Sequence, residues 1–176
     1  MPPLSALPLD IRAMFSQFPT GVVVVGARVG TAVSGMVVSS FSVGVSLSPP
    51  LVSFAAQRTS ETWPPLREVP RLGISILSQN QSELCAKIAS TANRHRRFDN
   101  VPHDVTQSGA LTIRDASVVM EVELVEEFPA GDHTLALLEV KHANSDIDRA
   151  PLVFHRSLFK EIVPSDSGSE RTHGTR

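Results

Sequence analysis

The sequence is short of the residues that several common classes of protein require. Of its 176 residues only Cys85 is a cysteine, one is a tryptophan and none is a tyrosine. A single cysteine cannot form an internal disulfide, which favours a reducing compartment and a cytoplasmic protein. With few aromatic side chains the chain has little surface on which single-stranded nucleic acid could stack. The composition therefore argues against a disulfide-rich secreted protein and against a stacking nucleic-acid binder.

Long hydrophobic runs and an excess of one charge are also absent. The longest apolar stretch, around Val22–Val25, is far below the roughly 20 residues that cross a bilayer. Residues 1–7 have no basic region ahead of an apolar run, unlike a secretory signal. Sixteen basic and eighteen acidic residues give a net charge of −2, without a basic stripe suited to nucleic acid. We expect a soluble protein that binds neither membranes nor nucleic acid.

The familiar catalytic and nucleotide-binding motifs are missing as well. The sequence has no Gly-x-Gly-x-x-Gly segment and no Gly-Lys-Ser or Gly-Lys-Thr, which excludes a Rossmann cradle and a phosphate loop. His95 and His103 are eight residues apart across a polar loop, which is not a zinc-binding spacing. Cys85 falls on the apolar side of a predicted helix, a poor position for a nucleophile. We therefore predict neither a metal site nor a nucleophilic cysteine.

Segments typical of β-strands dominate what is present. They are rich in β-branched or apolar residues and are separated by Gly, Pro or Ser clusters: Val22–Val25, Thr31–Ser39, Leu51–Ala55, Arg71–Leu77, Ser117–Phe128 and Thr134–Ala143. Helical spacing of apolar residues predicts helices over 9–18 and over 82–89. Many strands without βα alternation favour an antiparallel barrel with peripheral helices. We expect one domain over 1–163 and a disordered tail over 164–176.

Hydroxyl groups are the most unusual feature of the first third of the chain. They recur at Ser34, Ser39, Ser40, Ser42, Ser46, Ser48 and Ser53. Such a run can bind an anion through hydroxyls and accessible amides, although it also fits a polar loop or sheet edge. Thr59 and Ser60, after Arg58, form a second anion-friendly patch. His133 stands in a turn, where a histidine can bind a ligand or simply be solvated. These residues alone name no reaction.

The order of five motifs resembles that of one known family. The motifs are Phe18–Val25, Gly35–Phe41 with Ser46–Val52, Arg97-Phe98, Gly131–Thr134 and Pro151–Arg156. Together they are similar to the flavin reductase-like, FMN-binding split-barrel family over about residues 11 to 162. The resemblance implies a mainly β fold, a six-stranded antiparallel split barrel of Greek-key type with a few helices, assembled as a homodimer. It also implies an NAD(P)H:flavin oxidoreductase, in which hydride passes from nicotinamide to flavin and the protein supplies no nucleophile.

The resemblance also assigns the residues of the site. The flavin ring and ribityl chain would be lined by Gly35, Met36, Val37, Val38, Ser39 and Ser40. Backbone groups at the ring edge would come from Ser53, Phe54 and Ala55. The phosphate would meet Arg58, Thr59 and Ser60, and the distal part of the flavin would meet Arg97 and Phe98. Arg156 and His133, the predicted catalytic residue, would lie on the nicotinamide side, where His133 would act as a hydrogen-bond donor that positions the nicotinamide. Val37 stands where the family often has Thr, which removes one hydroxyl contact.

The identity of the flavin, the nicotinamide and the acceptor stays open at this point. Both FAD and FMN fit, and a basic cluster at 94–97 favours FAD, although a solvated loop explains the cluster equally well. NADH is preferred to NADPH because no clamp for a 2′-phosphate is recognisable. We expect the reduced flavin to pass to a separate flavin-dependent monooxygenase. The alternatives are a flavoprotein that retains its flavin and reduces a ferric chelate or a small organic acceptor, and a non-catalytic flavin-binding module.

Overall fold

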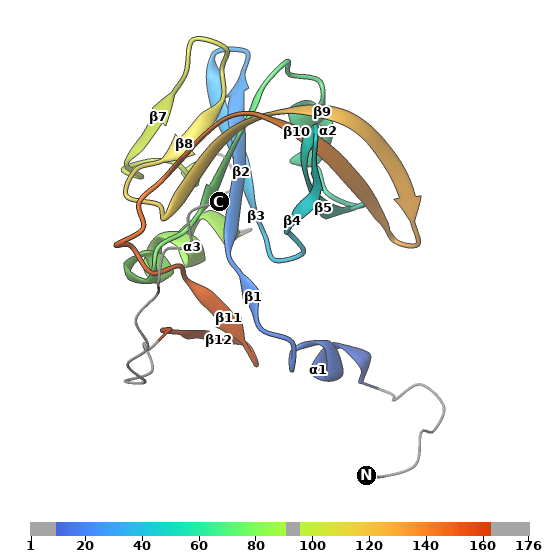
Figure 1. Cartoon of the computed structure of the whole chain (residues 1–176), viewed down its shortest axis with the longest axis vertical. Coiled ribbons are helices and arrows are strands. Elements are labelled where there is room, and N and C mark those ends of the chain that lie inside the picture. The colour runs from blue at the N-terminus through green and yellow to red at the C-terminus, as the bar shows by residue number, and fades with distance from the viewer. Residues whose placement is uncertain (1–9, 91–95, 163–176) are drawn as a thin grey trace, which may run out of the picture.

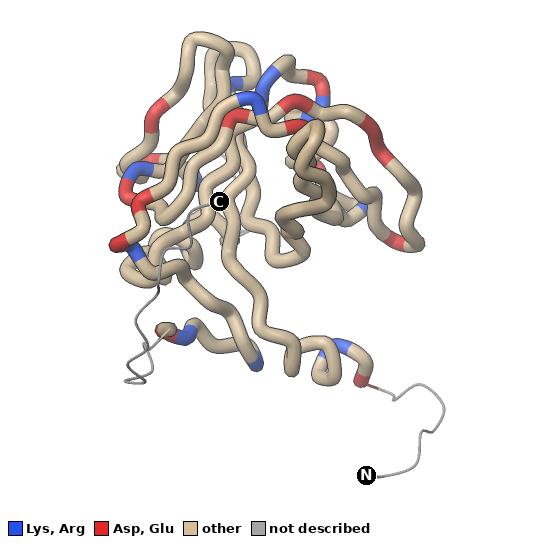
Figure 2. The backbone as a smooth tube through the Cα atoms, viewed as in Figure 1, with Lys and Arg blue, Asp and Glu red and all other residues tan. Residues whose placement is uncertain are grey.

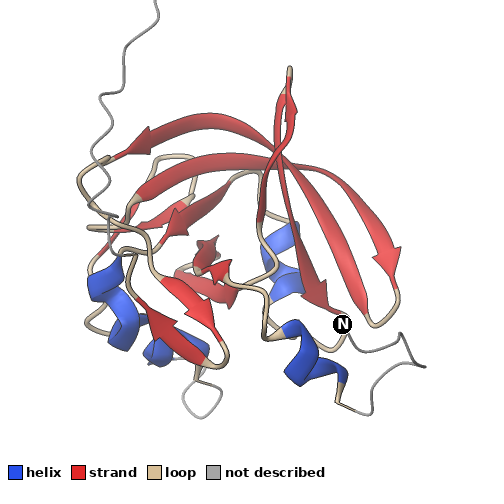
Figure 3. Cartoon of the chain, turned by 60° about the horizontal axis from the view of Figure 1, so that its bottom comes forward, coloured by secondary structure: helices blue, strands red, loops and turns tan. Residues whose placement is uncertain are grey.

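The chain folds into antiparallel sheets with a few short peripheral helices, as Figures 1 and 3 show for a computed structural model that describes residues 10–90 and 96–162. The predicted mainly β, antiparallel fold is therefore confirmed. The predicted tail at 164–176 lies outside the described residues, as do Arg94 and His95 of the basic cluster. No helix in the described part of the chain is long and apolar enough to span a membrane.

The largest sheet contains seven strands in the order β3-β2-β6-β9-β10-β5-β4, and each neighbouring pair is antiparallel. Their bounds are β2 (Val23–Val29), β3 (Ala32–Val38), β4 (Ser42–Leu47), β5 (Pro50–Gln57), β6 (Leu72–Ile76), β9 (Val118–Ala130) and β10 (His133–Ser145). No strand pairing among the described residues joins the end strands β3 and β4. Because the sheet has seven strands and is open there, a closed six-stranded barrel stays a prediction.

Smaller elements complete the fold. A three-stranded sheet holds β1 (Thr20–Gly21), β11 (Val153–His155) and β12 (Leu158–Lys160), and a two-stranded sheet holds β7 (His103–Val105) and β8 (Leu111–Ile113). The helices are α1 (Ile11–Phe15), α2 (Trp63–Arg67), the 3₁₀ turn η1 (Gln79–Gln81) and α3 (Ser82–Ala89). The helix expected over 82–89 has those bounds. The helix expected over 9–18 is shorter, and the Asp10 carboxylate accepts a hydrogen bond from the Ala13 N–H at its start.

Two apolar cores flank β2, because alternate side chains of a strand point to opposite faces. Val23 and Val25 pack in one core with Trp63 and Leu66 of α2, and Val24 packs in the other with residues of α3. A fully buried side chain of this size contributes about 1.5–3 kcal/mol. The two cores therefore fix α2 and α3 on opposite faces of β2 and its neighbour β3, and this arrangement frames the site.

Candidate functional site

A pocket of about 420 Å³ lies where the end of β3 meets β5, the loop before α2, the end of α3 and the start of β10. Many of the predicted site residues line it: Met36, Val37, Val38, Ser39, Ser40, Ala55, Thr59, Ser60, Arg97 and His133. These residues come from segments that are far apart in the sequence. The fold therefore brings together most of the residues that the motif order assigned to one site.

His133 reaches the pocket because β10 pairs with β5, which places it opposite Gln57. Its Nδ1 lies 2.7 Å from Oδ1 of Asp132, and this hydrogen bond lowers the pKa of the Asp132 carboxyl group. The Arg58 N–H donates to the Asp132 carbonyl oxygen at 3.0 Å, which ties the β9–β10 turn to the loop after β5. The imidazole is therefore held through Nδ1, which leaves Nε2 as the nitrogen for a ligand.

Two of the predicted hydroxyl groups shape the pocket wall. The Ser40 hydroxyl accepts from the Ala55 N–H at 2.9 Å and donates to the Ala55 carbonyl at 3.1 Å. The Ser60 hydroxyl oxygen accepts from the N–H groups of Thr62 and Trp63 at the start of α2. The Ser60 hydroxyl hydrogen stays available to an anion, whereas Ser40 already donates its own to Ala55.

Arg97 supplies a nearly buried guanidinium group, with 8% of the residue exposed. Its Nε donates to the Ser90 carbonyl oxygen at 2.9 Å, and Nη1 lies 3.5 Å from the Thr62 hydroxyl. A guanidinium held in this way presents fixed donors, which suit a phosphate better than a flexible ammonium does. The loop before α2 and the segment after α3 are thereby joined at one positively charged point of the pocket.

Three other predicted contacts lie behind the wall of the pocket rather than on it. A Cβ atom added to Gly35 would lie only 2.6 Å from Cζ of Phe98, so the aromatic ring packs directly against this glycine. Phe54 is fully buried and its ring contacts Trp63 edge-on, with the ring centroids 5.0 Å apart. Gly35, Phe54 and Phe98 thus support β3 and β5 from inside, and their predicted contacts with flavin stay predictions.

The remaining three assigned residues are not brought to the pocket lining either. Ser53 is buried in β5 opposite Ser42, and Arg58 is exposed next to the pocket. Arg156 stands in the β11–β12 turn, where its Nε donates to Oε1 of Gln17 at 2.7 Å. Its left-handed backbone, with φ of 51°, belongs to this turn. The structure therefore does not bring Arg156 to His133 within one chain.

Sequence reasoning missed several residues of the lining: Gln57, Glu61, Thr62, Ile88 and Ala89. Thr62 precedes α2, a helix that the sequence analysis did not predict. Prolines 64 and 65 in its first turn are tolerated there and are a usable signal of a helix start. Ile88 and Ala89 lie on a helix that was predicted, but their apolar character indicated core packing only.

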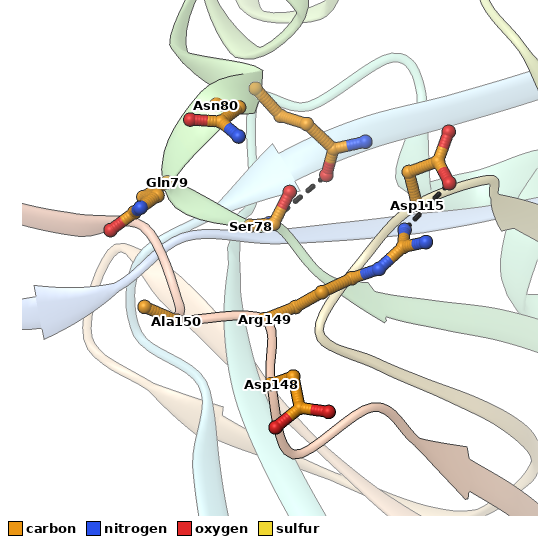
Figure 4. Close-up of a pocket in the computed structure, with 8 residues that line it drawn as sticks. Ser78, Gln79, Asn80, Asp115, Asp148, Arg149 and Ala150 are labelled. Atoms are coloured by element: carbon orange, nitrogen blue, oxygen red, sulfur yellow. Dashed lines mark hydrogen bonds and ion pairs between the residues drawn. The ribbon is translucent and has the colours of Figure 1, made fainter.

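A second polar pocket of about 440 Å³ lies beside η1 and the segment before β11 (Figure 4). Arg149 crosses it and pairs with Asp115 at 2.6 Å and with Asp146 at 2.7 Å, so its positive charge is neutralised within the protein. None of the predicted site residues lines it.

Elsewhere on the described chain Lys and Arg alternate with Asp and Glu without forming a stripe of one sign (Figure 2).

The residues of the 420 Å³ pocket fit a flavin nucleotide. Its volume lies within the roughly 300–1,000 Å³ typical of small-molecule sites. The half-buried Met36 and Val37 offer an apolar surface to a flat ring, while Ser60 and Arg97 offer donors to an anionic tail. Among residues 10–90 and 96–162 no group of three His, Cys, Asp or Glu side chains is placed to hold a metal ion.

Comparison with known proteins identifies the family. The model of the flavin reductase like domain matches residues 15–162. The chain belongs to the flavin reductase like family. It is 34% identical over 159 residues to an NADH:FMN oxidoreductase of Rhodococcus qingshengii, covering 88% of this chain and 82% of that one. Over 157 residues it is 25% identical to the reductase subunit of a flavin-dependent monooxygenase from Rhodococcus jostii (strain RHA1), covering 89% and 79%.

A solved structure supports the same family. The chain superposes on the NADH:FAD oxidoreductase of Streptomyces globisporus C-1027, in complex with NAD and FAD fragments, with a TM-score of 0.83. The two sequences are 31% identical, and the match covers 91% of this chain and 94% of that one. The flavin reductase like family predicted from the motif order is therefore confirmed by sequence and by fold.

Proposed function

We propose that this protein is an NADH-dependent flavin reductase that transfers hydride from NADH to FAD or FMN. The observation that carries the proposal is the convergence of Met36–Ser40, Thr59–Ser60, Arg97 and His133 on one pocket. Relatives named as NADH:FMN and NADH:FAD oxidoreductases support it, because they match nearly the whole chain. NADPH is the alternative donor.

The chain's own residues bind and orient rather than react. The apolar side chains at 36–38 hold the ring, and the hydroxyls of Thr59 and Ser60 with the Arg97 guanidinium bind the phosphate. His133, held by Asp132 through Nδ1, would hydrogen-bond the nicotinamide nucleotide through Nε2. When bound, the flavin supplies the electron-accepting chemistry. Holding two rings in near-attack geometry accounts for a large part of the rate, so no protein nucleophile is required.

We further propose that the enzyme supplies its reduced flavin to a separate flavin-dependent monooxygenase. A relative that is the reductase subunit of such an enzyme supports this assignment. The proposal requires flavin to behave as a substrate that leaves. Gel filtration of protein mixed with FAD or FMN should strip the flavin. Retained flavin with reduction of a ferric chelate would instead favour a prosthetic-group enzyme, and binding without NADH oxidation would favour a non-catalytic module.

We further propose a homodimer of split barrels. Exposed apolar side chains on α1, just after it and on β12 support this assembly: Met14, Phe15, Phe18, Leu158 and Phe159. The six-stranded barrel is proposed because the Ser40 side chain bonds the end of β3 to β5, where the sheet would close. Residues 1–163 would form the domain and 164–176 a disordered tail, in a cytoplasmic protein. Sedimentation equilibrium with the mass of two chains tests the dimer.

Aerobic NADH oxidation with and without added flavin tests the activity. We expect oxidation to depend on FAD or FMN, to saturate with flavin and to be absent from heat-denatured protein. The four combinations of FAD or FMN with NADH or NADPH should be compared under the same conditions. The proposal fails if neither nicotinamide is oxidised faster when flavin is added.

A further inference from the structure

A smaller pocket adjoins the flavin pocket and shares Arg97 with it. It measures about 340 Å³ and lies between the end of α3 and the turn that follows Arg97. Its described lining consists of Lys87, Ser90, Arg96, Arg97, Asp99 and Asn100. We call it the α3 pocket. Three of these six side chains are cations and one is an anion.

The charges in the α3 pocket do not balance. Nε of Arg96 lies 2.8 Å from Oδ2 of Asp99, so this carboxylate neutralises one positive charge. Lys87 donates instead to the backbone carbonyl of Asp99, which carries no net charge. No carboxylate contacts the Lys87 ammonium among the interactions of the described residues. The α3 pocket therefore has surplus positive charge next to polar groups, which suits a phosphate group.

The position of Arg97 connects this charge to the proposed flavin site. Arg97 belongs to the walls of both pockets and is nearly buried between them. Under the proposed function it binds the first phosphate of the flavin nucleotide, together with Thr59 and Ser60. FAD differs from FMN by an adenylate group joined to that same phosphate. A second phosphate would continue past Arg97, away from the ring, and the α3 pocket is the adjoining space.

We infer that the α3 pocket binds the adenylate half of FAD and makes FAD the preferred flavin of this enzyme. The inference rests on the proposed function. Lys87 and Arg96 would contact the second phosphate, and Asn100 offers an amide to the nucleoside. FMN lacks this half, so it would be bound by the larger pocket alone.

The test compares FAD with FMN in the wild type and in the double variant Lys87→Ala/Arg96→Ala. We expect the dissociation constant and the KM for FAD to rise about tenfold, as for the loss of charge-assisted contacts, with both constants for FMN unchanged. Dissociation constants are measured by quenching of flavin fluorescence without NADH. The matched control is Arg114→Ala/Lys141→Ala, which also removes two cations, both in ion pairs that lie away from both pockets. This control should leave the dissociation constant and the KM unchanged for both FAD and FMN.

Competition by AMP distinguishes the two nucleotides that carry an adenylate. If the inference is right, AMP competes with FAD, not with FMN, and loses this effect in the double variant. If AMP competes with NADH alone, the α3 pocket serves the nicotinamide nucleotide and the inference is wrong. Equal changes for FAD and FMN, or no change for either, also overturn it. If the wild type reduces neither flavin, the proposed function fails instead, which separates the two conclusions.

Discussion

The hydroxyl group of Ser40 hydrogen-bonds both backbone groups of Ala55, accepting from its N–H and donating to its carbonyl oxygen. This contact continues the β4–β5 register, in which Ser42 lies opposite Ser53, by two further positions, ahead of the start of β4. The Ser40 side chain thus makes the two hydrogen bonds to the β5 backbone that a neighbouring strand would otherwise make at Ala55. Ser40, a predicted flavin-binding residue, therefore also connects the segment between β3 and β4 to β5.

Replacement of Ser40 by alanine should remove both hydrogen bonds to Ala55. Because the site is solvent-exposed, water can replace part of the lost bonding, so we expect about 1 kcal/mol less unfolding free energy. The dissociation constant for flavin should rise as well, since the pocket wall loses its attachment. Ser39→Ala, at the neighbouring exposed residue, should change stability by less than about 0.5 kcal/mol. Urea unfolding and flavin titration measure both quantities, and an equal loss of unfolding free energy in the two variants would contradict this role of Ser40.

Gly35→Ala should destabilise the fold much more than Gly21→Ala. The new methyl group at position 35 would lie 2.6 Å from Cζ of Phe98 and 2.8 Å from the carbonyl oxygen of Val25. A Cβ at Gly21 meets nothing within 4 Å. Overpacking of this kind costs about 1–3 kcal/mol. We predict a clear loss of stability at position 35, measured by thermal or urea unfolding, and a near-neutral effect at position 21. Similar unfolding midpoints for Gly35→Ala and Gly21→Ala would contradict this prediction and show that Phe98 can move away from β3 at little cost.

His133→Ala should raise the KM for NADH about tenfold, the value of one charge-assisted hydrogen bond, and leave the dissociation constant for flavin nearly unchanged. Asp132→Asn should produce a smaller rise, because the amide holds Nδ1 less strongly. The lowered pKa of Asp132 means that this carboxylate loses its charge only below its ordinary range. The orienting effect should therefore persist as the pH falls through that range. His142→Ala, on the same strand, is the control; unchanged nicotinamide kinetics in His133→Ala would remove His133 from the site.

Cys85 should be inert in the folded protein. Burial raises the pKa of its thiol to about 11, so almost none is thiolate at pH 8. We expect slow reaction with a disulfide reagent in buffer and fast reaction in urea, where the thiol regains its ordinary pKa. Cys85→Ala should retain flavin reduction. A rapid native reaction, or loss of activity in a folded Cys85→Ala variant, would contradict the absence of a nucleophile from the proposed chemistry.

The sequence was sufficient to predict the strands whose residues are β-branched and buried, such as β2 and β6. It did not predict β4, because Ser42–Leu47 mixes glycine and serine with exposed valines. The short helix α2 was also missed, since two prolines follow Trp63 and such pairs usually mark loops. Its position depends on a contact distant in sequence, in which the Trp63 indole donates to the Glu127 carboxylate at 2.7 Å.

The site was predictable where one wall of the pocket is one continuous segment. Residues 36–40 and 59–60 were assigned from the family resemblance, whose motifs are such continuous segments, and both line the pocket. Glu61, Thr62 and Ile88 could not be assigned, because their roles arise from packing between separate elements. Arg156 was assigned from its motif, yet a left-handed turn directs it toward Gln17.

A single anaerobic experiment shows directly whether the protein transfers hydride from NADH to flavin. Oxidised FAD or FMN is mixed with NADH and a small amount of the protein, and the visible absorbance of the flavin is followed together with NADH. We expect the flavin absorbance to disappear while one NADH is consumed for each flavin reduced, and added oxygen to restore it. Flavin that keeps its absorbance in the presence of both protein and NADH would contradict the account.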